Sequence, residues 1–189
     1  LEFRRVLFRS IILNKTATQK LMTAALCLAL GLLLPSMFHM IGAGTVFLPM
    51  HIPVLLCGML CGGAYGAAVG AIVPLLSSLL TGMPPIFPVA PAMMFELCAY
   101  GLLSGLFYHS LRRNVYLSLI GAMLGGRVVS GIANAVFMGM ADKPYGFSAF
   151  LSGAFVTALP GILLQLIVIP LLVLALQKAG LAGRTAAAR

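Results

Sequence analysis

The sequence predicts an all-α integral membrane protein with six transmembrane helices and with its N and C termini in the cytoplasm. Of its 189 residues, 61% are hydrophobic and 8% are charged, whereas soluble domains carry about 25% charged residues. The mean hydropathy is +1.11. Inside a bilayer only helices and closed barrels satisfy their own backbone hydrogen bonds. Long continuous apolar runs, without the alternation of barrel strands, indicate that the spans are helices.

Six apolar stretches are expected to form the spans. The run from residue 52 to 80 is too long for one helix, and Gly62-Gly63 is the expected hinge that divides it. Four prolines within residues 81–91 argue against a regular helix there. The predicted spans are residues 21–38, 48–61, 64–80, 92–108, 116–138 and 147–176.

The placement of basic residues sets the expected topology. Of the 12 Lys and Arg residues, ten lie in the first twenty residues or in two later clusters, at residues 112–113 and 178–189. Six spans put all of these on one side, while the other side carries Lys143, which Asp142 balances. Basic residues flank the cytoplasmic ends of spans, so we expect a multi-pass protein of a bacterial inner membrane. The net charge of +9 then requires no nucleic-acid partner.

Three segments are expected along the chain. Residues 1–10 resemble translated cloning sequence and are expected to be a non-native leader. Without their three Arg and one Glu the net charge is +7, so the topology argument stands. Residues 11–180 form the predicted membrane domain, and residues 181–189 form a basic cytoplasmic tail. The four cysteines lie in apolar segments and are expected to be small buried side chains, not a disulfide or zinc framework.

The three predicted external connections are long, nearly uncharged and rich in Gly, Pro and aromatic residues. They comprise residues 40–49, 81–91 and 140–146. Long loops in a small protein are usually functional, so we expect a ligand site that opens outward beneath them. The residues expected to contact the ligand near these loops are Phe87, Met93 and Tyr145.

Two charged residues fall inside predicted spans. Charge at membrane depth costs about 2.5–3.5 kcal/mol on insertion scales, so Glu96 and Arg127 are expected to face the bundle or a cavity. Ser130 and Asn134 follow Arg127 at i+3 and i+7, on one helix face. Two compatible interpretations stay open: a structural Glu96–Arg127 ion pair, or direct contact of these residues with a ligand. Asn134 could equally donate a hydrogen bond between helices.

Histidines offer a further polar group. His51 lies in Leu48-Pro-Met-His-Ile-Pro53, where prolines leave backbone groups unpaired, and it is a candidate ligand-binding residue. A metal site made of His39 and His51 is the less favoured alternative, so no metal and no cofactor are expected. Gln165 is expected to be structural.

Small residues recur at four-residue spacing, which lets membrane helices approach closely. Most such pairs are expected to pack inside the bundle, including Gly66/Gly70 and Gly101/Gly105. Ala25 and Ala29 could instead offer a smooth strip to a partner helix.

Four segments together resemble the substrate-binding S component of energy-coupling factor (ECF) vitamin transporters. They are Ala25-Leu-Cys-Leu-Ala29, Leu48-Pro-Met-His-Ile-Pro53, Leu79-Leu-Thr-Gly-Met-Pro-Pro85 and Met93-Met-Phe-Glu96. The likeness covers roughly residues 15–180. It implies a substrate-capture subunit for a water-soluble vitamin or vitamin precursor, without an ATPase of its own, that docks on a transmembrane coupling subunit carrying two ATPase subunits.

The resemblance also bears on individual residues. Ala25 and Ala29 match the contact with the coupling subunit, and Glu96, Arg127 and Asn134 fall on spans that line the pocket of the family. The sequence has no Trp, so it lacks the Trp residues that stack the substrate in the thiamine-binding branch. Folate, pantothenate, niacin, a pyrimidine precursor and a benzimidazole all stay open as ligands.

Two other classes of protein are alternatives to this one. A self-contained channel or small secondary carrier is the main alternative, and an inverted repeat would favour it, but none is visible. An intramembrane enzyme is disfavoured because the sequence lacks the common catalytic motifs.

Overall fold

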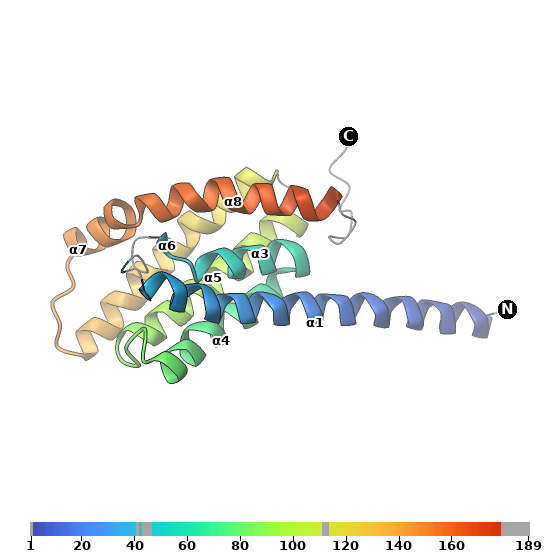
Figure 1. Ribbon diagram of the computed structural model, residues 1–189, viewed down its shortest axis with the longest axis horizontal. Coiled ribbons are helices and arrows are strands. Elements are labelled where there is room, and N and C mark those ends of the chain that lie inside the picture. Colours follow the sequence, from blue (N-terminus) through green and yellow to red (C-terminus); the bar gives the residue numbers. More distant parts are fainter. Residues whose placement is uncertain (1, 41, 43–46, 111–113, 179–189) are drawn as a thin grey trace.

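The computed structural model (Figure 1) describes residues 2–40, 42, 47–110 and 114–178, and in this part of the chain all regular structure is helical. Two of the elements, η1 and η2, are short π-helical segments. The elements are α1 (Glu2–Met40), α3 (His51–Cys61), α4 (Gly63–Thr81), α5 (Val89–Gly105), η1 (Leu106–Ser110), α6 (Val115–Met140), α7 (Phe147–Leu151), η2 (Ser152–Thr157) and α8 (Leu159–Lys178).

Five helical stretches of the described chain are long and apolar enough to cross a membrane, which confirms the all-α membrane class. They are Ala17–Phe38, Gly63–Thr81, Val89–His109, Val115–Met140 and Leu159–Leu176. The second predicted span corresponds to α3, which has 11 residues. Such a helix is about 16 Å long, about half of the 30 Å hydrocarbon core. The count of six spans therefore stays a prediction.

The helices are arranged so that the start of α1 and the end of α8 lie at the same end of the bundle (Figure 1). The connections from α4 to α5 and from α6 to α7 lie at the opposite end. This arrangement agrees with the expectation that the termini lie at one end of the bundle and these two long connections at the other. Which compartment each end faces stays a prediction.

Helix α3 is the central element. It packs against α1, α4, α5 and α8, and nine of its residues are buried. The predicted hinge after it is confirmed: α3 ends at Cys61 and α4 begins at Gly63, joined by Gly62 at φ 107°. That backbone conformation favours glycine because it has no Cβ.

Close packing of α4 on α5 depends on glycines, as the four-residue spacing predicted. A Cβ added to Gly66 would lie 2.6 Å from the carbonyl oxygen of Gly101 and 2.6 Å from the Cα of Gly58. Backbone from three helices meets at this point, so a side chain would push the helices apart. Three cysteines, Cys27, Cys57 and Cys61, are buried free thiols near this core, while Cys98 is half-buried.

The prediction of one continuous sixth span over residues 147–176 is wrong. The segment is divided into α7, η2 and α8, with Ala158 between the last two. Pro160 has no N–H and its ring clashes with the preceding turn, so it is accommodated in the first turn of α8 and the helix is interrupted just before it. The apolar composition of the segment did not indicate this break, but Pro160 is the signal in the sequence that could have located it.

The fourth predicted span also begins earlier than expected, at Val89 instead of residue 92. Pro91 is thus part of the helix. A proline is tolerated there because in the first turn of a helix it removes no intrahelical hydrogen bond. Consequently Glu96 lies about two turns into the helix, whereas a start at residue 92 would have placed it about one turn in.

Some expectations concern residues outside the described part. The residues affected are 41, 43–46, 111–113 and 179–189, which include Arg112, Arg113 and the expected basic tail. Helix α1 begins at Glu2, and the assignment of residues 1–10 as a leader stays a prediction.

Candidate functional site

Glu96 is the centre of a buried polar cluster formed by α3, α5 and α6. Its Oε1 accepts a hydrogen bond from Arg127 Nη1 at 3.2 Å and lies 3.4 Å from His51 Nε2. Its Oε2 accepts a hydrogen bond from Ser130 Oγ at 2.8 Å. Asn134 Nδ2 donates to the carbonyl oxygen of Ser130 at 2.9 Å and lies 3.3 Å from its Oγ. The face predicted from the spacing of residues 127, 130 and 134 thus meets Glu96.

The cluster is assembled by close contact between α5 and α6. Tyr100 follows Glu96 by one turn, and a Cβ added to Gly126 would lie 2.9 Å from its ring. The missing side chain at Gly126 lets the Tyr100 ring lie directly against α6. Tyr100 also packs edge-on against His51, with ring centroids 5.1 Å apart. We did not predict this contact, although the i+4 relation to Glu96 places Tyr100 on the same helix face.

His51 begins α3, and only 2% of it is exposed. Its backbone N–H donates to the carbonyl oxygen of Leu48 at 3.1 Å. A histidine nitrogen that faces a carboxylate carries the proton, so in the neutral ring Nε2–H donates to Glu96 and Nδ1 is an acceptor. Nδ1 is buried and has no hydrogen-bond partner among the residues that the structure describes. Buried polar groups are nearly always paired, so an unpaired one indicates a missing partner or a function.

His51 lines a cavity of about 270 Å³ at the end of the bundle that holds the α4–α5 connection. Met93 of α5 lines it as well, and the remaining wall is apolar. The lining residues are Pro35, Leu48, Pro49, Met50, His51, Met83, Pro84, Pro85, Val89 and Met93. His51 and Met93 were predicted from the sequence as ligand-binding residues, and both line this cavity. Pro35 was missed, because no pattern in the sequence shows which face of α1 turns toward the cavity.

The cavity exists because α3 is shorter than its neighbour. Helix α4 has 19 residues and α3 has 11, a difference of about 12 Å in length. The chain before His51 must descend into the bundle by about that distance. Non-helical backbone at membrane depth is tolerated where it is buried in protein or lines a cavity, and residues 48–50 do line this one.

The wall contributed by the α4–α5 connection is held by hydrogen bonds. Ser77 Oγ donates to the carbonyl oxygen of Met83 at 2.8 Å, and Thr81 Oγ1 lies 3.2 Å from the same atom. On the opposite wall, Leu48 has φ 49°, a left-handed conformation that is uncommon for a side chain other than glycine. Such strain concentrates at ligand sites.

Three further buried side-chain nitrogens lack partners in the described structure: Nε of Arg127, Nε2 of Gln165 and Nε2 of His109. Leaving such a donor unpaired costs about 1–3 kcal/mol. Arg127 stands behind Glu96 and does not line the cavity with His51. Gln165 is 1% exposed on α8, and its expected structural role stays a prediction.

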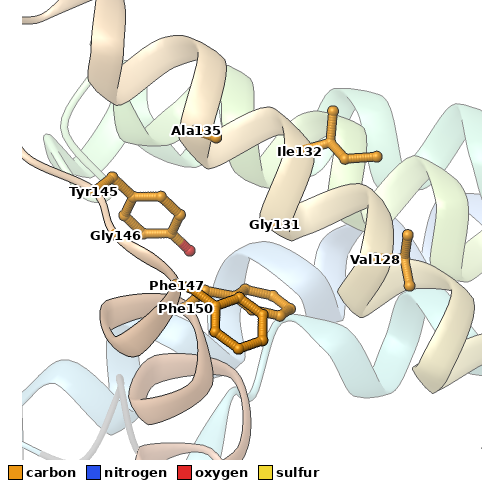
Figure 2. Close-up of a pocket in the computed structure, with 8 residues that line it drawn as sticks. All are labelled: Val128, Gly131, Ile132, Ala135, Tyr145, Gly146, Phe147 and Phe150. Atoms are coloured by element: carbon orange, nitrogen blue, oxygen red, sulfur yellow. The ribbon is translucent and has the colours of Figure 1, made fainter.

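Two residues expected near the ligand lie elsewhere. Phe87 is half-exposed and packs edge-on against Phe137, with ring centroids 6.4 Å apart. Tyr145 points into a separate pocket of about 380 Å³ between α6 and α7, together with Phe147 and Phe150 (Figure 2). Partial burial raises the pKa of Tyr145 above its usual value, so the hydroxyl is protonated at neutral pH. The structure thus separates Phe87 and Tyr145 from the His51 cavity.

Ala25 and Ala29 are both exposed on α1, while Ala24 and Cys27 face the bundle. The strip is continued by exposed apolar side chains such as Leu26 and Leu33, each 61% exposed. The strip is therefore available to another helix and takes no part in internal packing.

No metal centre is evident in the described residues, which contain no group of three or more His, Cys, Asp or Glu side chains that could hold an ion. The side chain of His39 lies outside the described part, so the alternative of a His39–His51 site is not tested.

Comparison with known proteins identifies the family. No curated protein and no solved structure matches the chain. The family model described as "ECF transporter, substrate-specific component" matches residues 19–173, a range that contains α3 to α6 and the whole Glu96 cluster. Because this match spans far more than half of the sequence, the chain belongs to the family of substrate-specific components of ECF transporters.

Proposed function

We propose that this protein captures a water-soluble vitamin or vitamin precursor from the external side of a bacterial inner membrane and delivers it through an ATP-driven ECF complex. Membership of the family makes it a substrate-binding subunit of a transporter, and the family is not a family of enzymes. The nature of the ligand, the side from which it enters and the partner subunits are the parts that we propose.

The observation that carries the proposal is the cavity that His51 lines. It lies beside the proline-rich α4–α5 connection, it is almost wholly apolar, and it contains one polar group backed by a buried acid. Small-molecule sites are typically apolar hollows with a few fixed polar groups. The Glu96 cluster fixes the imidazole, because the carboxylate is itself held by Arg127 and Ser130.

The proposed partner is a transmembrane coupling subunit that carries two ATPase subunits. The exposed strip at Ala25 and Ala29 supports this, since small residues allow close approach of a second helix. A self-contained carrier would not need such a surface.

Ligand extraction tests the proposal. The protein is purified in mild detergent from cells grown in rich medium, denatured, and its released small molecules are identified by mass spectrometry. We expect one compound at near-stoichiometric amount that is depleted from a matched preparation of His51→Phe. A control preparation of Phe147→Leu, altered in the separate α6–α7 pocket, should retain the compound. Equal recovery from the wild type and His51→Phe would contradict the proposal.

A further inference from the structure

The connection between α4 and α5 carries exposed apolar side chains in addition to those that line the His51 cavity. We propose that these exposed side chains bind the acyl chains of the membrane leaflet at their end of the bundle, so that the connection is held by lipid. The surface concerned is called the aromatic face and consists of Ile86, Phe87, Phe95 and Phe137. The proposal is independent of the ligand that the cavity takes.

The aromatic face is continuous from the connection to two helices. Phe87 packs edge-on against Phe137 of α6, with ring centroids 6.4 Å apart. Phe137 also stacks on Phe95 of α5, with ring centroids 6.0 Å apart and ring planes at 23°. Ile86 is 63% exposed, Phe87 50% and Phe95 46%. Exposed apolar patches mark surfaces that bind proteins or membranes, so this face is expected to have a partner.

The position of the rings along the helices places the face at membrane depth. Both α5 and α6 belong to stretches that are long and apolar enough to cross a membrane. Phe95 lies six residues after Val89, the first residue of α5, which is about 9 Å along the helix axis. Phe137 lies in the last turn of α6, which ends at Met140. Because Phe87 contacts Phe137, the connection lies beside the end of a membrane-spanning helix.

The absence of charge favours lipid as the partner. From residue 21 to residue 95 the sequence contains no Lys, Arg, Asp or Glu. Protein interfaces combine an apolar centre with a polar rim, whereas acyl chains require an apolar surface alone. The α6–α7 connection lies at the same end of the bundle (Figure 1) and exposes Asp142 and Lys143. Of these two connections, the one between α4 and α5 therefore has the chemistry of a lipid contact.

The lipid contact also bears on the ligand cavity. Met83, Pro84 and Pro85 of the same connection line the cavity, and Ile86 and Phe87 are not among its lining residues. The connection thus contributes one set of side chains to the cavity and another to the aromatic face. Lipid bound to the aromatic face therefore holds a segment that also forms a wall of the cavity.

Single-Trp variants test the proposal, because the sequence has no Trp and each variant carries one fluorescent reporter. Phe87→Trp and Ile86→Trp place the reporter on the aromatic face, and Lys143→Trp is the matched control in the other connection. Each full-length variant is reconstituted into phosphatidylcholine vesicles with plain or brominated acyl chains and titrated with acrylamide. We expect both face variants to emit at shorter wavelength than the control, to lose most of their emission in brominated vesicles and to resist acrylamide. Lys143→Trp should keep its emission in brominated vesicles and lose it to acrylamide.

Three results would overturn the proposal. Quenching of the face variants by acrylamide and not by brominated lipid would place the connection in water. Emission that resists both quenchers would show that protein, such as a second copy of this chain, covers the face. Equal lipid quenching of Lys143→Trp would show that the aromatic face is not a specific lipid contact. Circular dichroism verifies folding, and Ile86→Trp decides the matter if Phe87→Trp does not fold. The test uses no ligand, so its failure leaves the proposed function untouched.

Discussion

Removing Arg127 should destabilise the protein unless Glu96 is neutralised at the same time. The two side chains lie 3.2 Å apart, and each is less than 10% exposed. Taking one partner from a buried pair leaves an uncompensated charge and typically costs about 3–5 kcal/mol. We therefore expect Arg127→Met to lower the free energy of unfolding by about that amount.

The double variant Arg127→Met/Glu96→Gln should recover much of this loss. The Gln side chain is uncharged and keeps an oxygen that can accept the hydrogen bond from Ser130, which is 2.8 Å from Glu96 in the wild type. Contacting residues of one network show interaction energies of about 0.5–3 kcal/mol. A buried ion pair belongs at the upper end of that range, so we expect a coupling of about 2–3 kcal/mol.

The assay is reversible unfolding in mixed micelles with increasing fractions of denaturing detergent. The sequence has no Trp, so helix content is followed by far-ultraviolet circular dichroism. Val128→Met is the matched control, because Val128 is 60% exposed beside Arg127 and surface substitutions usually change stability by less than about 0.5 kcal/mol. If the double variant equals the sum of the single variants, the pair is not coupled and the reasoning is refuted.

Three other predictions follow from the packing and the surfaces. Gly101→Ala should lower the free energy of unfolding by more than about 2 kcal/mol, the cost of overpacking a tight core, because the added Cβ would meet the Gly66 backbone. The control Gly139→Ala adds a Cβ in open space and should leave the free energy of unfolding nearly unchanged. Similar effects of the two substitutions would argue against the close packing of α4 on α5. Ala25→Trp/Ala29→Trp should prevent co-purification with a coupling subunit while leaving ligand binding intact. The control Val128→Trp on α6 should leave both co-purification and ligand binding intact. Loss of ligand binding in the Ala25/Ala29 variant would place the strip in the core. In a background without the native cysteines, Met83→Cys and Tyr145→Cys should both react with an impermeant thiol reagent added outside the cell. Ligand should protect only Met83→Cys, because Met83 lines the His51 cavity. Reaction from the cytoplasmic side alone would reverse the proposed topology.

The helices and the polar cluster could be predicted because local patterns determine them. Hydropathy located the long helices, and a glycine pair located the hinge at Gly62. The spacing of Arg127, Ser130 and Asn134 put three polar groups on one face. Glu96 was the other charge within the predicted spans. The cost of leaving either charge in lipid placed both of them toward the bundle or a cavity, and a Glu96–Arg127 pair was one of the two interpretations left open.

The depth of each element could not be predicted, because depth depends on how helices of unequal length pack together. The short α3 creates the cavity, yet its sequence is as apolar as that of a spanning helix. Phe87 and Tyr145 were expected beside the ligand from their loops alone, and the structure directs them to Phe137 and to the α6–α7 pocket. The composition of residues 147–176 suggested one helix, but the helix is interrupted before Pro160. A proline is tolerated in the first turn of a helix, so α8 begins there as a new helix.

The central claim is that the cavity lined by His51 and Met93 holds the ligand. Structure determination of the protein purified with its extracted ligand tests this most directly. We predict ligand density between the residue 48–50 segment and the α4–α5 connection, in contact with His51 and Met93. Density in the α6–α7 pocket beside Tyr145, with the His51 cavity empty at saturating ligand, would contradict it.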